Sequence, residues 1–186
     1  MDKETWVPAI RLFIITIIAG LLLGIAHNVT QKAIDAKKDD SALRAVLQDA
    51  TEFKKVEVSG NNDKIKEVYE GIKDGNNVGY AIVFEAKGFK GPLNITIGIG
   101  KDDKITGMKL EAPDDTAGLG KEAEKPEFLN QFKGKSPKTE LKVAKTAQNP
   151  DEIQALSGAT ITSKGAVNGV NMVLDYYKTE LKGGQK

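Results

Sequence analysis

Hydrophobic residues are distributed along the chain in successive patterns. A nearly unbroken apolar run occupies residues 12–26. Alternating apolar and polar positions follow between residues 51 and 110, and apolar residues recur at helical spacing between residues 163 and 181. In order, these patterns predict a membrane-spanning helix, an antiparallel sheet and a C-terminal helix.

The apolar run predicts an N-terminal transmembrane anchor over residues 1–30. With its apolar flanks it reaches the ~20 residues that a bilayer requires. Trp6 and Arg11 precede the run and suit one membrane interface, where arginine can extend its charge into water. A buried core helix is disfavoured, because core helices rarely stay apolar on every face.

A cleaved signal peptide is the alternative interpretation of the same run. Arg11 can serve as its n-region charge, and Gly24-Ile25-Ala26 fits a small-x-small cleavage site. The length of the apolar run and of the polar lead before it favours the uncleaved anchor.

A connecting helix is expected over residues 31–50. Its apolar residues recur at helical spacing, interrupted by the charged segment Lys37-Lys38-Asp39-Asp40, which is typical of a solvated face. The apolar positions are Ala33, Ile34, Ala42, Leu43, Val46 and Leu47. This helix, from Gln31 to Gln48, either continues the anchor as a stalk or packs on the domain that follows.

Strands connected in hairpins are predicted between residues 51 and 110. The turn clusters Asp74-Gly75-Asn76-Asn77 and Asp102-Asp103 separate segments rich in aromatic and β-branched residues. The expected strands are Val68–Ile72, Gly79–Ala86, Leu93–Gly100 and Ile105–Leu110. Their order predicts a meander of antiparallel strands.

Helices and a short strand are expected in the rest of the chain. Glu122–Phe132 should form a short helix, Leu141–Ala144 a strand, and Ser163–Leu181 a long helix. The inner face of the long helix is marked by Ala166, Val167, Val170, Val173, Leu174 and Tyr177. The fold class is therefore α+β: an anchor, then one domain over residues 51–182 with an antiparallel sheet and packed helices, and a flexible tail at residues 183–186.

Composition excludes several classes of function. The 186 residues carry a formal net charge of +1, with acidic and basic residues interleaved, so the basic face of a nucleic-acid binder is missing. The chain has no cysteine, which excludes disulfides, thiolate metal sites, iron–sulfur clusters and cysteine nucleophiles. A lone histidine, His27, supports neither histidine catalysis nor a metal site.

The segment Ser157-Gly158-Ala159-Thr160-Ile161-Thr162-Ser163 concentrates hydroxyl groups and small residues just before the C-terminal helix. Small residues let a flat ligand approach the backbone, and hydroxyls offer hydrogen bonds or a point of attachment. Thr162 or Ser163 can cap the helix, whose N-terminus favours a phosphate. The residues therefore suit a phosphate-bearing ligand, but an ordinary capped helix explains them as well and is the commoner case, because serine and threonine caps are frequent.

The first part of this segment, Ser157-Gly158-Ala159-Thr160, resembles the Ser/Thr-Gly-Ala-Thr motif of the FMN-binding domain family. That family includes the G subunit of Rnf-type electron transport complexes and the C subunit of the sodium-translocating NADH:quinone reductase. The resemblance implies covalent FMN, which a separate flavin transferase attaches through its phosphate to Thr160. Thr162 is the alternative attachment site. The family usually has an aspartate where this chain has Gln154; Asp151 lies nearby.

Two further stretches resemble the family in the same order. Gly88-Phe89-Lys90-Gly91-Pro92 is one, and Thr116-Ala117-Gly118-Leu119-Gly120 is similar to a loop that lies beside the flavin in Rnf G subunits. In that loop Asp115 stands in place of a glutamate and Ala117 in place of a proline; a glycine turn leading into a helix is the alternative. The resemblance implies cofactor-binding roles for Ser157, Gly158, Ala159, Thr160, Thr162, Thr116, Gly118, Leu119 and Gly120.

The function implied by the resemblance is electron relay by a membrane-anchored flavoprotein subunit of an Rnf-type ferredoxin:NAD oxidoreductase complex, coupled to Na+ or H+ translocation. Its partners would be other membrane subunits, a flavin transferase and the lipid bilayer. The domain would lie on the extracytoplasmic side of the cell membrane. No residue needs to act as an acid, a base or a metal ligand.

Other functions stay open at this level. The chain could be the C-type subunit of the quinone reductase, although its length fits the G-type subunit better. Gln154 favours a flavin-free anchored domain with a binding role in the envelope. A stand-alone anchored FMN reductase is a further possibility.

Overall fold

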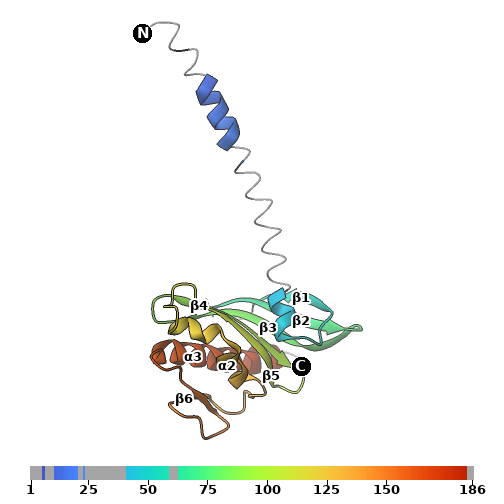
Figure 1. Ribbon diagram of the computed structural model, residues 1–186. Coiled ribbons are helices and arrows are strands. Elements are labelled where there is room, and N and C mark those ends of the chain that lie inside the picture. The colour runs from blue at the N-terminus through green and yellow to red at the C-terminus, as the bar shows by residue number, and fades with distance from the viewer. Residues whose placement is uncertain (1–5, 7–10, 21–22, 24–40, 59–62, 184–186) are drawn as a thin grey trace. The chain divides into compact units, whose positions relative to one another are not determined.

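A computed structural model of the chain describes residues 6, 11–20, 23, 41–58 and 63–183 (Figure 1). The chain divides into two compact units, residues 1–40 and 41–186. In the first unit residues 11–20 are helical and exposed. No helix among the described residues is long and apolar enough to cross a membrane. Most of the expected anchor, and residues 31–40 of the expected connecting helix, lie outside the described residues.

A five-stranded antiparallel sheet in the order β1-β2-β3-β4-β5 forms the centre of the second unit, which confirms the predicted meander. Its strands are β1 (Glu52–Val56), β2 (Ile65–Lys73), β3 (Asn76–Lys87), β4 (Pro92–Gly100) and β5 (Ile105–Glu111). The β2–β3 turn is tighter than the turn cluster predicts: Asp74 and Gly75 take positive φ angles of 51° and 75°, and β3 begins directly at Asn76.

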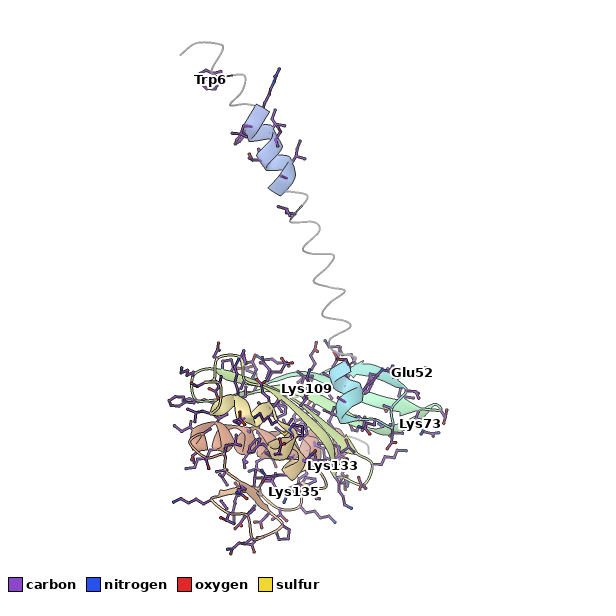
Figure 2. The ribbon with its side chains drawn as sticks, in the orientation of Figure 1. Trp6, Glu52, Lys73, Lys109, Lys133 and Lys135 are labelled. Atoms are coloured by element: carbon purple, nitrogen blue, oxygen red, sulfur yellow. The ribbon has the colours of Figure 1, made fainter. Side chains whose placement is uncertain are left out.

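The main core lies on one face of this sheet. Ile82 and Phe84 of β3 point to that face and are fully buried beneath helix α3 (Thr160–Tyr176), whereas charged residues such as Lys73 and Lys133 lie on the surface (Figures 1 and 2). Every inner-face residue predicted for the C-terminal helix is buried, as expected from its 3.6-residue spacing. This helix is the element that carries the hydroxyl-rich segment.

Helix α3 lies unusually close to β3 because two glycines face the strand. A Cβ atom built on Gly165 would be 2.0 Å from the carbonyl oxygen of Lys87, and one on Gly169 would be 2.7 Å from Cβ of Ala86. Real atoms do not approach so closely, so any side chain at Gly165 would push the helix from the sheet. The glycines therefore place the N-terminal end of α3 beside the β3–β4 loop.

The opposite face of the sheet holds the end of the expected connecting helix. Residues 41–46 are helical, and Leu43 and Val46 are buried with Ala81 of β3. A Cβ atom on Gly98 would be 2.2 Å from the Val46 carbonyl oxygen, which also accepts a hydrogen bond from Thr106 Oγ1 at 2.5 Å. In the described part, the helix thus packs on the domain.

The helix predicted over Glu122–Phe132 is wrong as a single element. The chain forms η1 (Gly120–Glu124), α2 (Pro126–Leu129) and η2 (Asn130–Phe132) instead. Lys125 is extended, with ψ of 148°, because the ring of the following proline disfavours a helical residue before it. Phe128 and Phe132 of this segment are buried and meet edge to face, with ring centroids 5.5 Å apart.

Two short strands that pair in parallel, β6 (Lys142–Ala144) and β7 (Glu152–Gln154), lead the chain back to α3. The first matches the strand expected at residues 141–144, whereas β7 was not expected. A three-residue strand carries too little pattern to be recognised without its partner. After α3, a π-helix, η3 (Tyr177–Lys182), continues the C-terminal helix to residue 182.

The β4–β5 turn is tied to this π-helix through Asp103, which accepts hydrogen bonds from Tyr177 Oη at 2.9 Å and from Lys182 Nζ. The bond from Lys182, supported by that from Tyr177, lowers the pKa of Asp103 below its usual value. A carboxyl whose pKa is lower in the folded state stabilises the fold above its unfolded pKa of about 3.9, and this contribution is lost as the pH falls through the folded pKa.

Asp103→Asn should therefore reduce the free energy of unfolding at neutral pH, by less than about 1 kcal/mol because the ion pair is exposed to solvent. Asparagine tolerates the positive φ of 62° at this position, so the turn itself should persist. Denaturant unfolding at pH values from 7 down to about 3 would measure the effect. The difference in free energy of unfolding between wild type and Asp103→Asn should become smaller as the pH falls. A difference that stays constant with pH would contradict the lowered pKa of Asp103.

Candidate functional site

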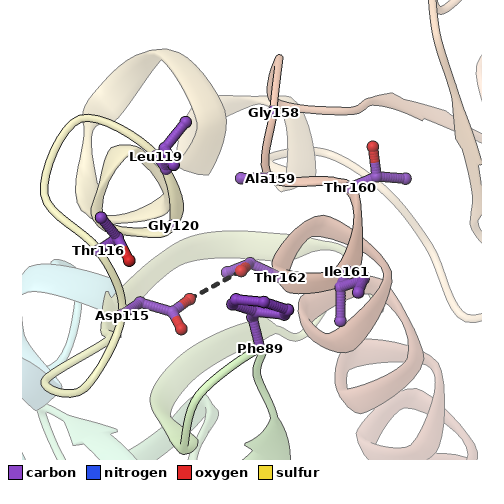
Figure 3. A pocket seen from close by; sticks show the side chains of 10 residues that line it. All are labelled: Phe89, Asp115, Thr116, Leu119, Gly120, Gly158, Ala159, Thr160, Ile161 and Thr162. Carbon is purple, nitrogen blue, oxygen red and sulfur yellow. Dashed lines mark hydrogen bonds between the residues drawn. The ribbon is translucent and has the colours of Figure 1, made fainter.

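A pocket of about 240 Å³ lies at the N-terminal end of α3 (Figure 3). It brings together the loop between β3 and β4, the loop before η1, and the turn that enters α3. Its lining residues are Phe89, Asp115, Thr116, Leu119, Gly120, Gly158, Ala159, Thr160, Ile161 and Thr162. The stretches that were singled out in the sequence, separated by dozens of residues, thus meet at one place.

Asp115 joins these segments. One carboxylate oxygen accepts a hydrogen bond from the backbone N–H of Lys90 at 3.1 Å, and the other accepts one from the Thr162 hydroxyl at 2.7 Å (Figure 3). The residue is only 6% exposed. Gly120 makes room for it, because a Cβ atom there would be 2.2 Å from the carboxylate. Asp115 therefore connects all three walls of the pocket.

The turn into α3 is held by Ser163. Its hydroxyl donates to the carbonyl oxygen of Ala159 and accepts from the backbone N–H of Leu156, both at 3.0 Å. The helix begins at Thr160, earlier than the predicted Ser163, so the expectation that Thr162 or Ser163 caps it is wrong. Ala159 occupies the cap position and no described side chain caps the helix, which leaves N–H groups of its first turn available to a ligand.

The candidate attachment residues differ in accessibility. Thr160, the first residue of the helix, is exposed, and its hydroxyl points away from the Asp115–Thr162 hydrogen bond in Figure 3. Thr162 is 1% exposed, and its hydroxyl donates a hydrogen bond to Asp115. A bond to a ligand phosphate requires an accessible oxygen, which Thr160 has and Thr162 lacks.

Most residues expected at the site do line the pocket. Ser157 and Gly118 do not line it: Ser157 is exposed, and Gly118 shapes its loop through a positive φ of 75°. Sequence reasoning missed Phe89, Asp115 and Ile161 as lining residues. Phe89 and Asp115 lie in or beside the matched stretches and could have been included, and Ile161 lies inside the hydroxyl-rich segment but has no hydroxyl group to mark it.

Apolar side chains form much of the wall. Phe89, Leu119 and Ile161 are 61%, 43% and 55% exposed, and within the described parts of residues 41–183 they are the exposed large hydrophobic residues. Exposed apolar surface gathered at one pocket commonly marks a binding site. Gly158 permits the close approach of Leu119, since a Cβ atom there would be 2.8 Å from Cδ2 of Leu119.

The chemistry of this arrangement is that of a binding site for a flat ligand with a phosphate group. The apolar wall suits a ring, and the helix N-terminus and the Thr160 hydroxyl suit the phosphate. Within the described residues, no group of histidine, cysteine, aspartate or glutamate could hold a metal ion.

Gln154, which replaces the usual aspartate of the motif, lies at the end of β7, outside the pocket lining. Its backbone N–H donates to the side-chain oxygen of Gln131 at 2.7 Å, and its own side chain is exposed. Asp151, considered as a substitute, does not line the pocket either. The replaced position is therefore not part of the pocket wall.

Comparison with known proteins agrees with this geometry. The profile of the FMN-binding domain matches residues 88–175, which contain all the pocket residues. The G subunit of the Na+-translocating ferredoxin:NAD+ oxidoreductase complex of Acetobacterium woodii is 33% identical over 184 residues, covering 90% of this chain and 88% of that protein. The G subunit of the proton-translocating ferredoxin:NAD+ oxidoreductase complex of Clostridium ljungdahlii is 31% identical, covering 91% and 89%.

Solved structures show the same fold. The C subunit of the Na+-translocating NADH-quinone reductase from Parabacteroides distasonis superposes with a TM-score of 0.65 at 24% identity, over 80% of this chain and 94% of that one. NqrC from Shewanella oneidensis superposes with a TM-score of 0.61 at 17% identity, over 80% and 99%. These structures show the fold alone; the relatives above 30% identity and the domain match show that the chain belongs to the FMN-binding domain family, and its sequence resembles the G subunits of ion-translocating ferredoxin:NAD+ oxidoreductase complexes.

Proposed function

We propose that this chain carries FMN, bound through its phosphate to Thr160, and relays electrons within a membrane-bound ferredoxin:NAD+ oxidoreductase complex coupled to Na+ or H+ translocation. The observation that carries the proposal is the position of Thr160. It is an exposed hydroxyl on the first residue of an uncapped helix, in a pocket whose wall includes three exposed apolar side chains, Phe89, Leu119 and Ile161.

The residues of the pocket fit the chemical parts of FMN. Thr160 would supply the ester oxygen, and the free N–H groups and positive end of α3 would stabilise the remaining phosphate charge. Phe89, Leu119 and Ile161 would contact the ring system, whose aromatic faces favour apolar neighbours. Gly120 and Gly158 keep the loops compact, so that the pocket stays open without a bulky side chain in it.

FMN, once bound, supplies the redox chemistry. The protein then holds the cofactor, prevents it from dissociating, and sets its electrostatic surroundings. No side chain in the pocket has to transfer a proton or act as a nucleophile toward a substrate. Such a role agrees with the relatives, which are named as single subunits of multi-subunit complexes.

We further propose that the N-terminal segment anchors the chain in the cell membrane, with the flavin domain on the extracytoplasmic side. The described helix at residues 11–20 exposes Leu12, Phe13 and Ile15, each more than half exposed, and after Arg11 its one polar side chain, Thr16, donates its hydroxyl to the Phe13 carbonyl oxygen. Lipid, the other membrane subunits of the complex and a flavin transferase would be the partners.

The decisive experiment is intact-mass analysis of the full chain after co-expression with a flavin transferase, followed by mapping of the peptide across residues 151–178. We expect an added mass equal to FMN less one water, located on Thr160, together with flavin absorption. An unmodified mass would favour a flavin-free envelope domain. Gln154→Asp is tested in parallel to find the reason for an unmodified mass. If that variant carries flavin and the wild type does not, Gln154 prevents attachment of FMN.

A further inference from the structure

The wall of the pocket contains an acidic group that the attachment chemistry does not use. Asp115 lines the pocket and is more than nine-tenths buried. Both of its oxygens accept hydrogen bonds, one from the Lys90 backbone and one from Thr162. Both oxygens of this side chain are therefore acceptors, and one of the donors, Thr162, lies in the first turn of α3.

The salt bridges between described residues do not include Asp115. Lys90 contributes its backbone N–H to this side chain. Buried charges are usually paired, because desolvation of an isolated charge is costly. Here the carboxylate is satisfied by hydrogen bonds alone, so its negative charge remains uncompensated beside the cavity.

We propose that Asp115 lowers the reduction potential of the flavin by placing this negative charge in the pocket wall, an inference that rests on the proposed function. Uptake of two electrons and one proton leaves the flavin with one more negative charge. That added charge is repelled by a neighbouring carboxylate more strongly inside a protein than in water, because the effective dielectric constant is lower. Asp115 is thus a residue that both positions the pocket and tunes its cofactor.

The test is the midpoint potential of the flavinylated full chain and of Asp115→Asn, measured by titration with dithionite at pH 7. Asparagine keeps an oxygen for the Lys90 N–H but removes the charge. We expect a higher potential in the variant, with the equilibrium between oxidised and reduced flavin shifted about tenfold toward the reduced form. Equal potentials in the two flavinylated proteins would overturn the inference and leave the proposed function standing.

Asp114→Asn is the matched control, because it removes the same charge from the adjacent, exposed residue outside the pocket lining. Water and salt screen an exposed charge, so Asp114→Asn should raise the midpoint potential of the flavin clearly less than Asp115→Asn does. If Asp115→Asn folds poorly, Asp115→Leu/Thr162→Val replaces both partners of the Asp115–Thr162 hydrogen bond by apolar groups of similar shape and should show the same raised potential. Equal shifts at positions 114 and 115 would show a general charge effect and reject the role of Asp115. Wild-type protein without flavin would instead refute the proposed function itself.

Discussion

Thr160→Ala is expected to abolish covalent FMN completely, while the fold remains intact. A phosphoester cannot form without the hydroxyl oxygen, so the loss should be all or none. Thr160 is exposed, and its side chain does not cap the helix. Alanine is also a good helix former, so the substitution should leave α3 in place. Intact mass and flavin absorption after co-expression with the transferase measure the result, and circular dichroism checks the fold.

Thr162→Val distinguishes the two candidate threonines. Valine matches the shape of threonine but leaves the Asp115 oxygen without its donor, which costs about 1–3 kcal/mol of stability. The variant should nevertheless carry flavin on Thr160. Flavin that persists in Thr160→Ala and disappears in Thr162→Val would move the attachment site to Thr162, contrary to the accessibility of the two hydroxyls.

Gly165→Ala should destabilise the domain by about 2 kcal/mol or more, even though alanine stabilises an isolated helix by about 1 kcal/mol relative to glycine. The added methyl group would be 2.0 Å from the Lys87 carbonyl oxygen, which belongs to the backbone of β3 and cannot move aside. The N-terminal end of α3 would be displaced, and the Asp115–Thr162 bond with it. Denaturant unfolding of the apo domain measures the loss.

Two controls accompany this prediction. Lys164→Ala changes the neighbouring exposed residue and should be close to neutral. Gly169→Ala should cost less than Gly165→Ala, because its overlap is smaller: the methyl group would be 2.7 Å from Cβ of Ala86, against 2.0 Å from the Lys87 carbonyl oxygen for Gly165→Ala. If Gly165→Ala were neutral or stabilising, α3 could not depend on this close contact with β3.

The meander and the inner face of α3 were predictable because they depend on local patterns. Alternation along β3 and β4 assigns residues to the two faces of a sheet, and the 3.6-residue spacing from Ala166 to Tyr177 assigns the buried face of the helix. The start of α3 was misplaced, because Ser163 looks like a cap in the sequence. In the structure its hydroxyl instead fastens the preceding turn to Ala159 and Leu156.

By itself, the sequence determined the order of β2 to β5, the apolar faces, and the place of the threonine motif before the C-terminal helix; β1 and β7 were not predicted. These features depend on neighbouring residues and on the period of a helix or strand. Only the tertiary structure decided that Phe89, Asp115 and Ile161 share a pocket with Thr160, and that Thr162 is buried rather than accessible. These facts depend on contacts such as that between Asp115 and Thr162, which are far apart along the chain and become neighbours only when α3 packs against the sheet.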